Sequence, residues 1–214
     1  MNCRTESLLS DKLEQDIAWR IQEVSIIKNM VKTTKSKQLQ AVIRSGLTIL
    51  YAHWEGFVKV SSEAYLQYVY YQKHKYCELA DCFVALGLKS KLNVISSSNK
   101  TNINIQSVSF VRDELNNKAS FSLDKAINTK SNLNSETFEN IAVSIGLDYS
   151  KYTSKYPLID IQLLKNRNEI AHGNYLKIDQ SAFLTLADEV ITLIRDYKTD
   201  IENAAYGKYY LKQA

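Results

Sequence analysis

The segment from Leu163 to Gly173 contains the residues whose types and spacing could do chemistry. Within it, four residues separate Arg167 from His172, and Asn168 follows the arginine directly. A guanidinium binds phosphate oxygens strongly, and an imidazole can carry a proton near neutral pH. The three side chains are therefore suited to handling a phosphodiester, with the histidine as a general acid or base.

The surroundings of Arg167 predict that it needs a negatively charged partner. On a helix, the residues about one turn away from it are all apolar: Leu163, Leu164, Ile170 and Ala171. The guanidinium would then lie on the face that should be buried, where an unpaired charge is costly. Its partner could come from the fold, from another subunit or from a ligand. Within the chain, Asp160 lies two turns earlier on nearly the same stripe and offers a purely structural ion pair.

The other two residues of the motif are expected at the end of the same helix. Gly173 is well placed as the left-handed residue that ends the helix, which leaves His172 on the last turn. The carbonyl end of a helix favours a protonated imidazole. Asn168 lies four residues before the histidine and shares its face. The structural alternatives are a histidine that interacts only with the helix dipole and an asparagine that bonds to nearby backbone.

The string from Arg167 to Gly173, RNEIAHG, resembles the RNxxxH signature of the HEPN superfamily. Upstream, the run from Tyr51 to Lys59, YAHWEGFVK, looks like the helix that precedes this motif in one branch of these bacterial proteins. HEPN proteins are α-helical. Prokaryotic members are often endoribonucleases of toxin–antitoxin, abortive-infection and restriction-associated antiviral defence systems.

The resemblance implies metal-independent RNA cleavage, in which the ribose 2′-hydroxyl attacks the adjacent phosphate and leaves a cyclic phosphate end. His172 would move the proton, Arg167 would stabilise charge on the phosphorane, and Asn168 would orient a partner or the phosphate. Family members commonly pair two motif helices across a homodimer to build one composite site. The further candidates for substrate contact are Tyr175, Lys59 and Glu55.

The resemblance also raises the question of control by a partner protein. Some HEPN toxins are silenced by an antitoxin that modifies a tyrosine two residues after the histidine. Here Asn174 occupies that position and Tyr175 follows it, so the chain departs from the pattern for that mode of control. An antitoxin or another defence-system protein stays a candidate partner.

Composition and charge are those of an ordinary globular protein of 214 residues, with 45% hydrophobic and 23% charged residues. The net charge of +4 is mildly favourable for RNA. Three dispersed histidines and three cysteines without ligand spacing do not suggest a metal site, and no cofactor is expected. Because the chain opens without a leader and has no membrane-length apolar run, we expect a cytoplasmic protein.

The fold is predicted to be all-α, an up-and-down helical bundle forming a single HEPN-like domain over residues 1–214. Apolar spacing and capping residues predict helices over 11–31, 38–73, 77–88, 136–147 and 157–172, and a last helix capped by Asp179. Asp11 and Glu14 would cap the first helix. A Ser/Asn-rich insertion at about 90–134 is expected to be partly irregular. It could hold a short helix near 111–116 or a strand over 102–110, where apolar and polar residues alternate.

Two other functions remain open at this stage. One is a non-catalytic HEPN module that binds nucleotide or RNA, or regulates a partner. The other is a helical scaffold in which Arg167 is a buried strut. His53, at the edge of the apolar stripe of its helix, is expected to be a boundary or core histidine without a catalytic role.

Overall fold

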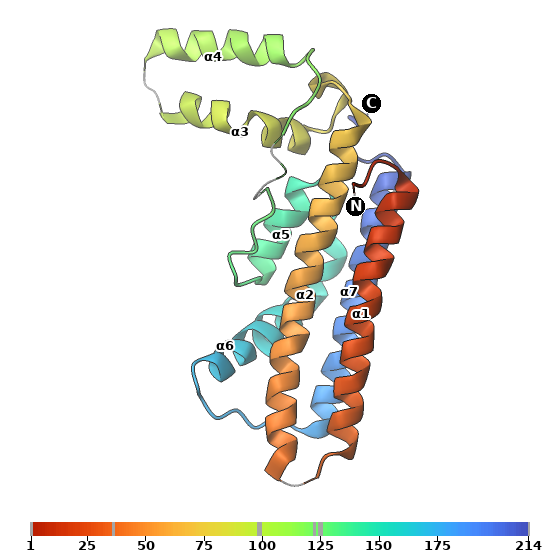
Figure 1. Cartoon of the computed structure of the whole chain (residues 1–214). Helices are drawn as coiled ribbons and strands as arrows, with labels where there is room; N and C mark the ends of the chain where they lie inside the picture. The colour runs from red at the N-terminus through yellow and green to blue at the C-terminus, as the bar shows by residue number, and fades with distance from the viewer. Residues whose placement is uncertain (1, 36, 98–99, 122, 124–125, 214) are drawn as a thin grey trace.

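The computed structural model describes residues 2–35, 37–97, 100–121, 123 and 126–213. Three long helices lie side by side: α1 (Glu6–Thr33), α2 (Lys37–Gln72) and α7 (Gln180–Tyr206) (Figure 1). In that view α1 runs downward, and α2 and α7 run upward. The predicted all-α fold is confirmed, since the described residues contain helices and two isolated bridges but no strand.

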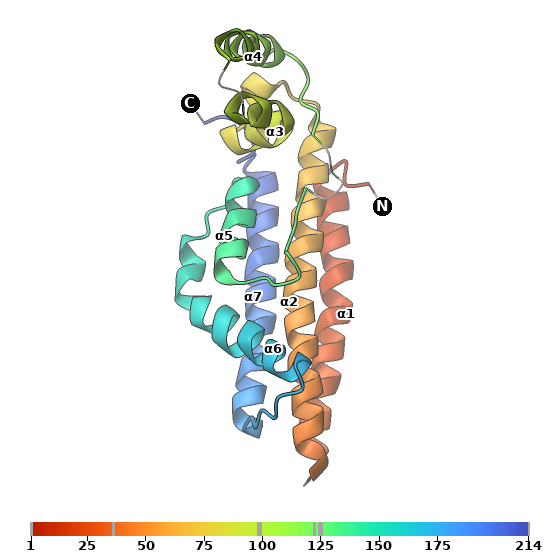
Figure 2. The same ribbon diagram turned by 90° about the vertical axis from the view of Figure 1, so that its left-hand side faces the viewer.

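The fourth position of the bundle is filled by a series of short helices instead of one long helix. These are α5 (Ser135–Ser144), η2 (Ser150–Lys155), η3 (Leu158–Lys165) and α6 (Asn166–Ala171). In Figure 2 the chain runs upward through α5 and then descends through η2 and η3 until α6 lies beside the lower half of α2. Arg167, Asn168 and His172 therefore belong to the least regular of the four positions of the bundle.

The first helix begins five residues before the predicted Asp11. Thr5 caps it, because its hydroxyl accepts a hydrogen bond from the backbone N–H of Leu8 at 3.3 Å. The apolar positions of this helix lie on one stripe, in which Ile21 is half-buried and the others are buried: Leu9, Leu13, Ile17, Val24, Ile27 and Val31. Thr5 and Asp11 are both good capping residues, and the earlier start brings Leu9, which is buried, into the helix.

The core is centred on aromatic side chains of α2, α5 and α7. Trp54 of α2 is fully buried, and its ring centre lies 5.3 Å from that of Phe138 and 6.2 Å from that of Tyr197. The Tyr197 hydroxyl is paired with Ser62 at 2.7 Å, which satisfies two buried polar groups. This packing makes α2 a rigid support for the elements that dock on its other side.

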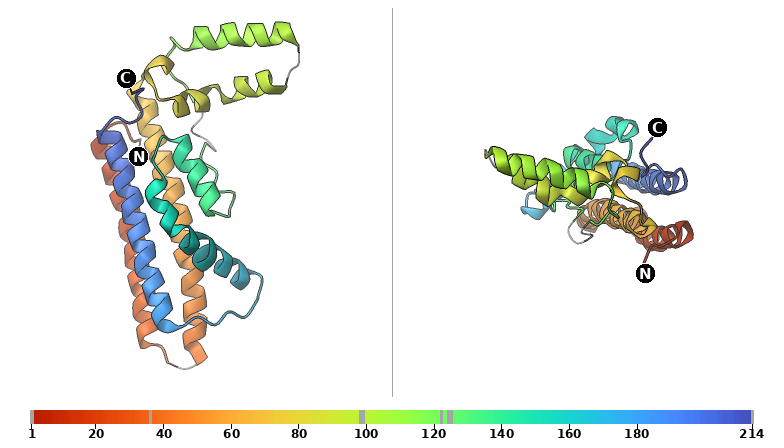
Figure 3. Two further views of the ribbon diagram at one scale, coloured as in Figure 1. Left: turned by 180° about the vertical axis from the view of Figure 1, so that it is seen from behind. Right: turned by 90° about the horizontal axis from the view of Figure 1, so that it is seen from above.

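A helical hairpin projects from the upper end of the bundle (Figures 1 and 3). After the short η1 (Tyr76–Glu78), α3 (Asp81–Ser97) extends beyond the predicted helix, and α4 (Thr101–Glu114) returns beside it. The alternation over 102–110 does not form the alternative strand. Ile105 and Val108 are 62% and 49% exposed, so the alternation does not mark a buried sheet face. The expected short helix near 111–116 is in fact the end of α4.

Within the described part of the chain, none of the helices combines the length and hydrophobicity needed to cross a lipid bilayer.

Candidate functional site

A wide π-helical turn precedes the motif and sets the direction of Arg167. The helix begins near Pro157 as predicted, but η3 is a π-helix, whose turns use about one residue more than α turns. On an unbroken α-helix Asp160 and Arg167 would lie within about 20° of each other. Instead Asp160 accepts hydrogen bonds from the backbone N–H and hydroxyl of Ser135, at 2.7 and 2.5 Å. The internal ion pair considered for Arg167 is therefore not formed.

Arg167 rests on α2 and keeps its charge unneutralised among the described residues. Its guanidinium carbon lies 4.1 Å from the centre of the Tyr51 ring. Its Nη2 donates to the carbonyl of Ser131 at 2.9 Å and to Asn132 Oδ1 at 3.3 Å. Its Nε is buried without a hydrogen-bond partner. The residue is only partly buried, in contrast to the expected full burial.

The loop that covers Arg167 has a strained backbone. Lys130 and Ser131 both adopt left-handed conformations, with φ of 55° and 54°, which cost about 1–2 kcal/mol each for non-glycine residues. This bend presents the Ser131 carbonyl to Arg167. The Tyr51 hydroxyl accepts a hydrogen bond from the Leu133 N–H at 2.6 Å and so holds the end of the same loop. Burial raises the pKa of the Tyr51 phenol, although Arg167 beside it acts in the opposite direction.

The helix ends as the sequence predicts. Gly173 has φ of 80°, and a Cβ there would meet no atom within 4 Å, so the position selects glycine through its backbone alone. The Gly173 N–H donates to the Ile170 carbonyl and the Asn174 N–H to the Glu169 carbonyl, at 3.1 and 2.9 Å. This pair of bonds is the Schellman arrangement. It leaves His172 as an exposed capping residue.

The side chains of the motif do not all point the same way. Arg167 and His172 are five residues apart, which corresponds to about 140° around an α-helix. Asn168 and His172 share a side, as expected from their spacing. Neither side chain forms a hydrogen bond or ion pair within the described ranges of the chain. One copy of the chain therefore presents its guanidinium and its imidazole to different surroundings.

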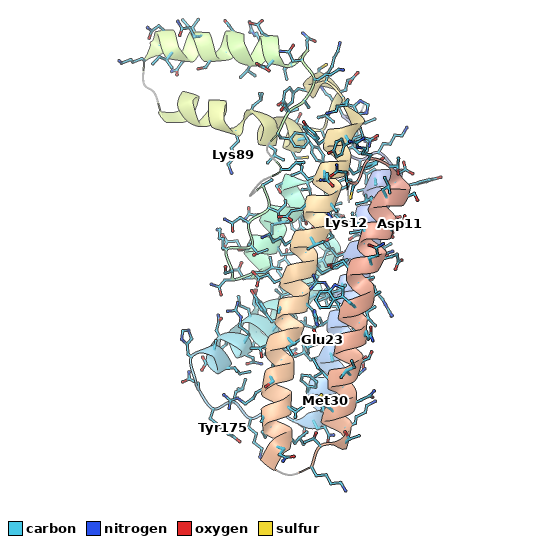
Figure 4. The ribbon with its side chains drawn as sticks, viewed as in Figure 1. Asp11, Lys12, Glu23, Met30, Lys89 and Tyr175 are labelled. Atoms are coloured by element: carbon cyan, nitrogen blue, oxygen red, sulfur yellow. The ribbon has the colours of Figure 1, made fainter. Side chains whose placement is uncertain are left out.

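Two of the three further candidates, Glu55 and Lys59, lie on α2, and the third, Tyr175, lies on the loop after α6. Glu55 is one helical turn beyond Tyr51, and its charge acts on the Tyr51 phenol. Lys59 lies one turn further on and is exposed. Tyr175 is 74% exposed on the loop after α6, which Figure 4 shows beside the lower half of α2.

The upstream run contains the string HWEGF at residues 53–57. Its histidine, His53, belongs to a polar cluster between α1 and α2, away from the motif. His53 is 3% exposed, and its Nε2 lies 2.8 Å from Glu23 Oε2. Arg20 donates to the His53 carbonyl at 3.3 Å and is paired with Asp16 at 2.6 Å. Burial, reinforced by the Arg20 charge, lowers the pKa of His53. The expectation of a boundary or core histidine agrees with this placement.

The glycine of the same run makes room for that cluster. A Cβ at Gly56 would lie 2.9 Å from Arg20 Nη1, closer than real Cβ contacts allow. The HWEGF run therefore has a packing role that its sequence alone did not reveal.

Several residues around the site were not identified from the sequence. Tyr51 and Arg44 could have been found, because they lie on the stripe of α2 that also carries Glu55. Ser131 and Asn132 gave no signal, since their contribution depends on a left-handed bend at non-glycine residues.

An all-α bundle with an RNxxxH motif at a helix end is the arrangement expected of a HEPN protein. The chain matches the model of the family described as HEPN_MAE_28990-like HEPN over residues 9–210 and therefore belongs to that family. Comparisons with curated proteins and with solved structures gave no match.

Proposed function

We propose that this chain is a metal-independent endoribonuclease, and that Arg167, Asn168 and His172 act on RNA at a site shared by two copies. The observation that carries the proposal is the state of Arg167. Its guanidinium is partly buried, has no carboxylate within ion-pair distance among the described residues, and holds a buried N–H without an acceptor. Such a group favours an anionic ligand, and membership of a HEPN family supports RNA or a nucleotide as that ligand.

The directions of the side chains support a composite site. Because Arg167 and His172 point about 140° apart, one copy does not readily place both on one phosphate. A second copy can bring its imidazole to the guanidinium of the first. Two facing motif helices also supply two histidines, one to accept a proton and one to donate it.

The proposed reaction needs only groups of the protein and the RNA. One His172 accepts the proton of the ribose 2′-hydroxyl, and the oxygen attacks the adjacent phosphorus. The bond from phosphorus to the 5′-oxygen breaks, and the His172 of the second copy donates a proton to that oxygen. The products are a 2′,3′-cyclic phosphate and a 5′-hydroxyl. Arg167 stabilises the negative charge of the phosphorane, and Asn168 orients a non-bridging oxygen.

The biological role that accompanies this proposal is that of a cytoplasmic toxin or antiphage effector. In that role a partner protein, such as an antitoxin, would restrain the activity until it is needed.

The direct test is RNA cleavage in the presence of a chelator. Wild-type protein should generate cyclic phosphate ends, and Arg167→Ala and His172→Ala should each reduce the rate by about a hundredfold or more. Arg195→Ala, at an exposed position of α7, and His74→Ala, next to α2, are matched controls that should retain the rate. Absence of cleavage by the wild type, or equal cleavage by all variants, would refute the proposal.

A subunit-mixing experiment tests the composite site. Wild-type protein is allowed to exchange subunits with excess inactive protein carrying both Arg167→Ala and His172→Ala. If each site needs two copies, the activity per wild-type chain falls as mixed dimers form. Unchanged activity per wild-type chain would show that each copy works alone.

The second candidate is a non-catalytic HEPN module that binds RNA or nucleotide, or regulates a partner. The His172 ring favours this candidate, because a catalytic histidine is usually oriented by a second group and none of the described residues does so here. This candidate predicts RNA binding that survives His172→Ala and produces no new RNA ends.

A further inference from the structure

We infer that Arg44 and Tyr175 form a second RNA contact beside the motif, in which the Tyr175 ring stacks on a base next to the phosphate held by Arg167. This inference rests on the proposed function in one respect, namely that the ligand is RNA. It adds a base-binding subsite to a motif that by itself contacts only the backbone of the strand.

The loop that carries Tyr175 is fixed to α2 at two points. Arg44 Nη2 donates to the Asn174 carbonyl at 3.1 Å. Further along, the Gln40 side chain donates to the Ile178 carbonyl at 2.9 Å and accepts from the Ile178 N–H at 3.2 Å. Because Tyr175 lies between these anchors, its ring is presented from a braced segment.

The ring of Tyr175 is available for stacking. It is 74% exposed, and the guanidinium carbon of Arg44 lies 5.7 Å from its centre, within the range of a cation–π contact. Aromatic rings backed by arginine are common platforms for single-stranded bases, and such stacking is tolerant of base identity.

Arg44 resembles Arg167 in its unneutralised charge. Its Nε is buried without a hydrogen-bond partner, and in the parts of the chain that the structure describes no carboxylate lies within ion-pair distance. Arg44 precedes Tyr51, on which Arg167 rests, by seven residues of α2. The two positions therefore share a side of the helix and lie about 10 Å apart along it. Arg44 and Arg167 therefore offer two positive charges along one side of α2, with the Tyr175 ring beside Arg44. This arrangement suits a single RNA strand, whose phosphates bind the arginines and whose base stacks on the ring.

The test uses short single-stranded RNAs that carry the fluorescent base 2-aminopurine at one position, moved along the strand from RNA to RNA. The full chain with His172→Ala keeps the RNA intact during binding. We expect quenching at a restricted position, and Tyr175→Ala in this background should abolish it and weaken binding about five- to a hundredfold. Tyr175→Phe should restore both, because it keeps the ring. Arg44→Met should reduce both.

Tyr206→Ala is the matched control, because Tyr206 is 80% exposed and lies at the far end of α7, about 40 Å along that helix. It should bind and quench as the parent does. Equal binding and quenching by Tyr175→Ala would overturn the inference while Arg167-dependent cleavage still stands. Position-specific quenching without cleavage by the wild-type chain would support the subsite and refute the nuclease. Absence of RNA binding by the His172→Ala chain would refute the subsite, whereas the nuclease is refuted by absence of cleavage by the wild type.

Discussion

The guanidinium of Arg167 lies over the ring of Tyr51, with its carbon 4.1 Å from the ring centre. The Tyr51 hydroxyl at the same time accepts the Leu133 N–H of the loop that contacts Arg167. One side chain of α2 therefore positions both the motif arginine and the loop above it. The two functions can be separated by mutation.

Tyr51→Phe should destabilise the protein while preserving cleavage. Loss of the hydroxyl leaves the buried Leu133 N–H unpaired, which costs about 1–3 kcal/mol of unfolding free energy, but the ring under Arg167 remains. Tyr51→Leu removes the ring as well and should lower the cleavage rate about tenfold or more. Urea unfolding and a cleavage assay measure the two effects. Equal cleavage by the two variants would show that the ring does not position Arg167.

Gly173→Ala should weaken the end of the motif helix. An alanine at φ of 80° is strained by about 1–2 kcal/mol, although its Cβ would meet no neighbouring atom. The strain should unwind the last turn and misplace His172, so that the melting temperature and the cleavage rate both fall. Gly173→Asn is the control, because asparagine tolerates the left-handed region and should retain more of both.

Asp160→Ala should lower stability and leave cleavage unchanged. Its carboxylate accepts two hydrogen bonds from Ser135 at the start of α5 and does not pair with Arg167. The loss should amount to about 1.5–3 kcal/mol of unfolding free energy, measured by urea titration. A loss of cleavage comparable with that of Arg167→Ala would indicate that Asp160 acts on the arginine after all.

The stability of the protein should fall below about pH 6.5 because of His53. Burial lowers the pKa of His53 in the folded chain, so the unfolded chain takes up a proton first as the pH falls. The stabilisation is present above about pH 6.5 and is lost below it, with a slope of at most about 1.4 kcal/mol per pH unit. His53→Gln should flatten the pH dependence of the unfolding free energy between about pH 5.5 and 7.5. An unchanged slope would contradict the assignment.

The features that the sequence predicts correctly are those decided by neighbouring residues. Asp179 caps α7 through the Ser181 and Ala182 N–H groups, and Gly173 ends α6, because both effects act within one turn. The apolar stripes of α1 and α2 also identify the core correctly, because residues three or four positions apart lie on the same helix face.

The features that escape prediction depend on contacts between distant segments. The π turn of η3 leaves no mark in the apolar spacing, so the direction of Arg167 relative to Asp160 was expected wrongly. Arg167 donates to the carbonyl of Ser131. The left-handed backbone at Lys130 and Ser131 could not be predicted, because neither residue is a glycine or an asparagine.

The π-helical geometry of η3 turns Asp160 and Arg167 toward different neighbours. Asp160 accepts a hydrogen bond from Ser135 of α5, whereas Arg167 packs on the Tyr51 ring of α2. A π turn corresponds to one residue inserted into an α-helix, so we expect that one residue can be deleted from this segment without changing the direction of Arg167. Deletion of Ile161, which is 56% exposed, should relax η3 to ordinary α geometry and keep cleavage and melting temperature near wild type. Deletion of Glu169 should instead turn His172 by about 100° and abolish cleavage. We therefore expect a one-residue deletion to be tolerated before Arg167 and to abolish cleavage after it.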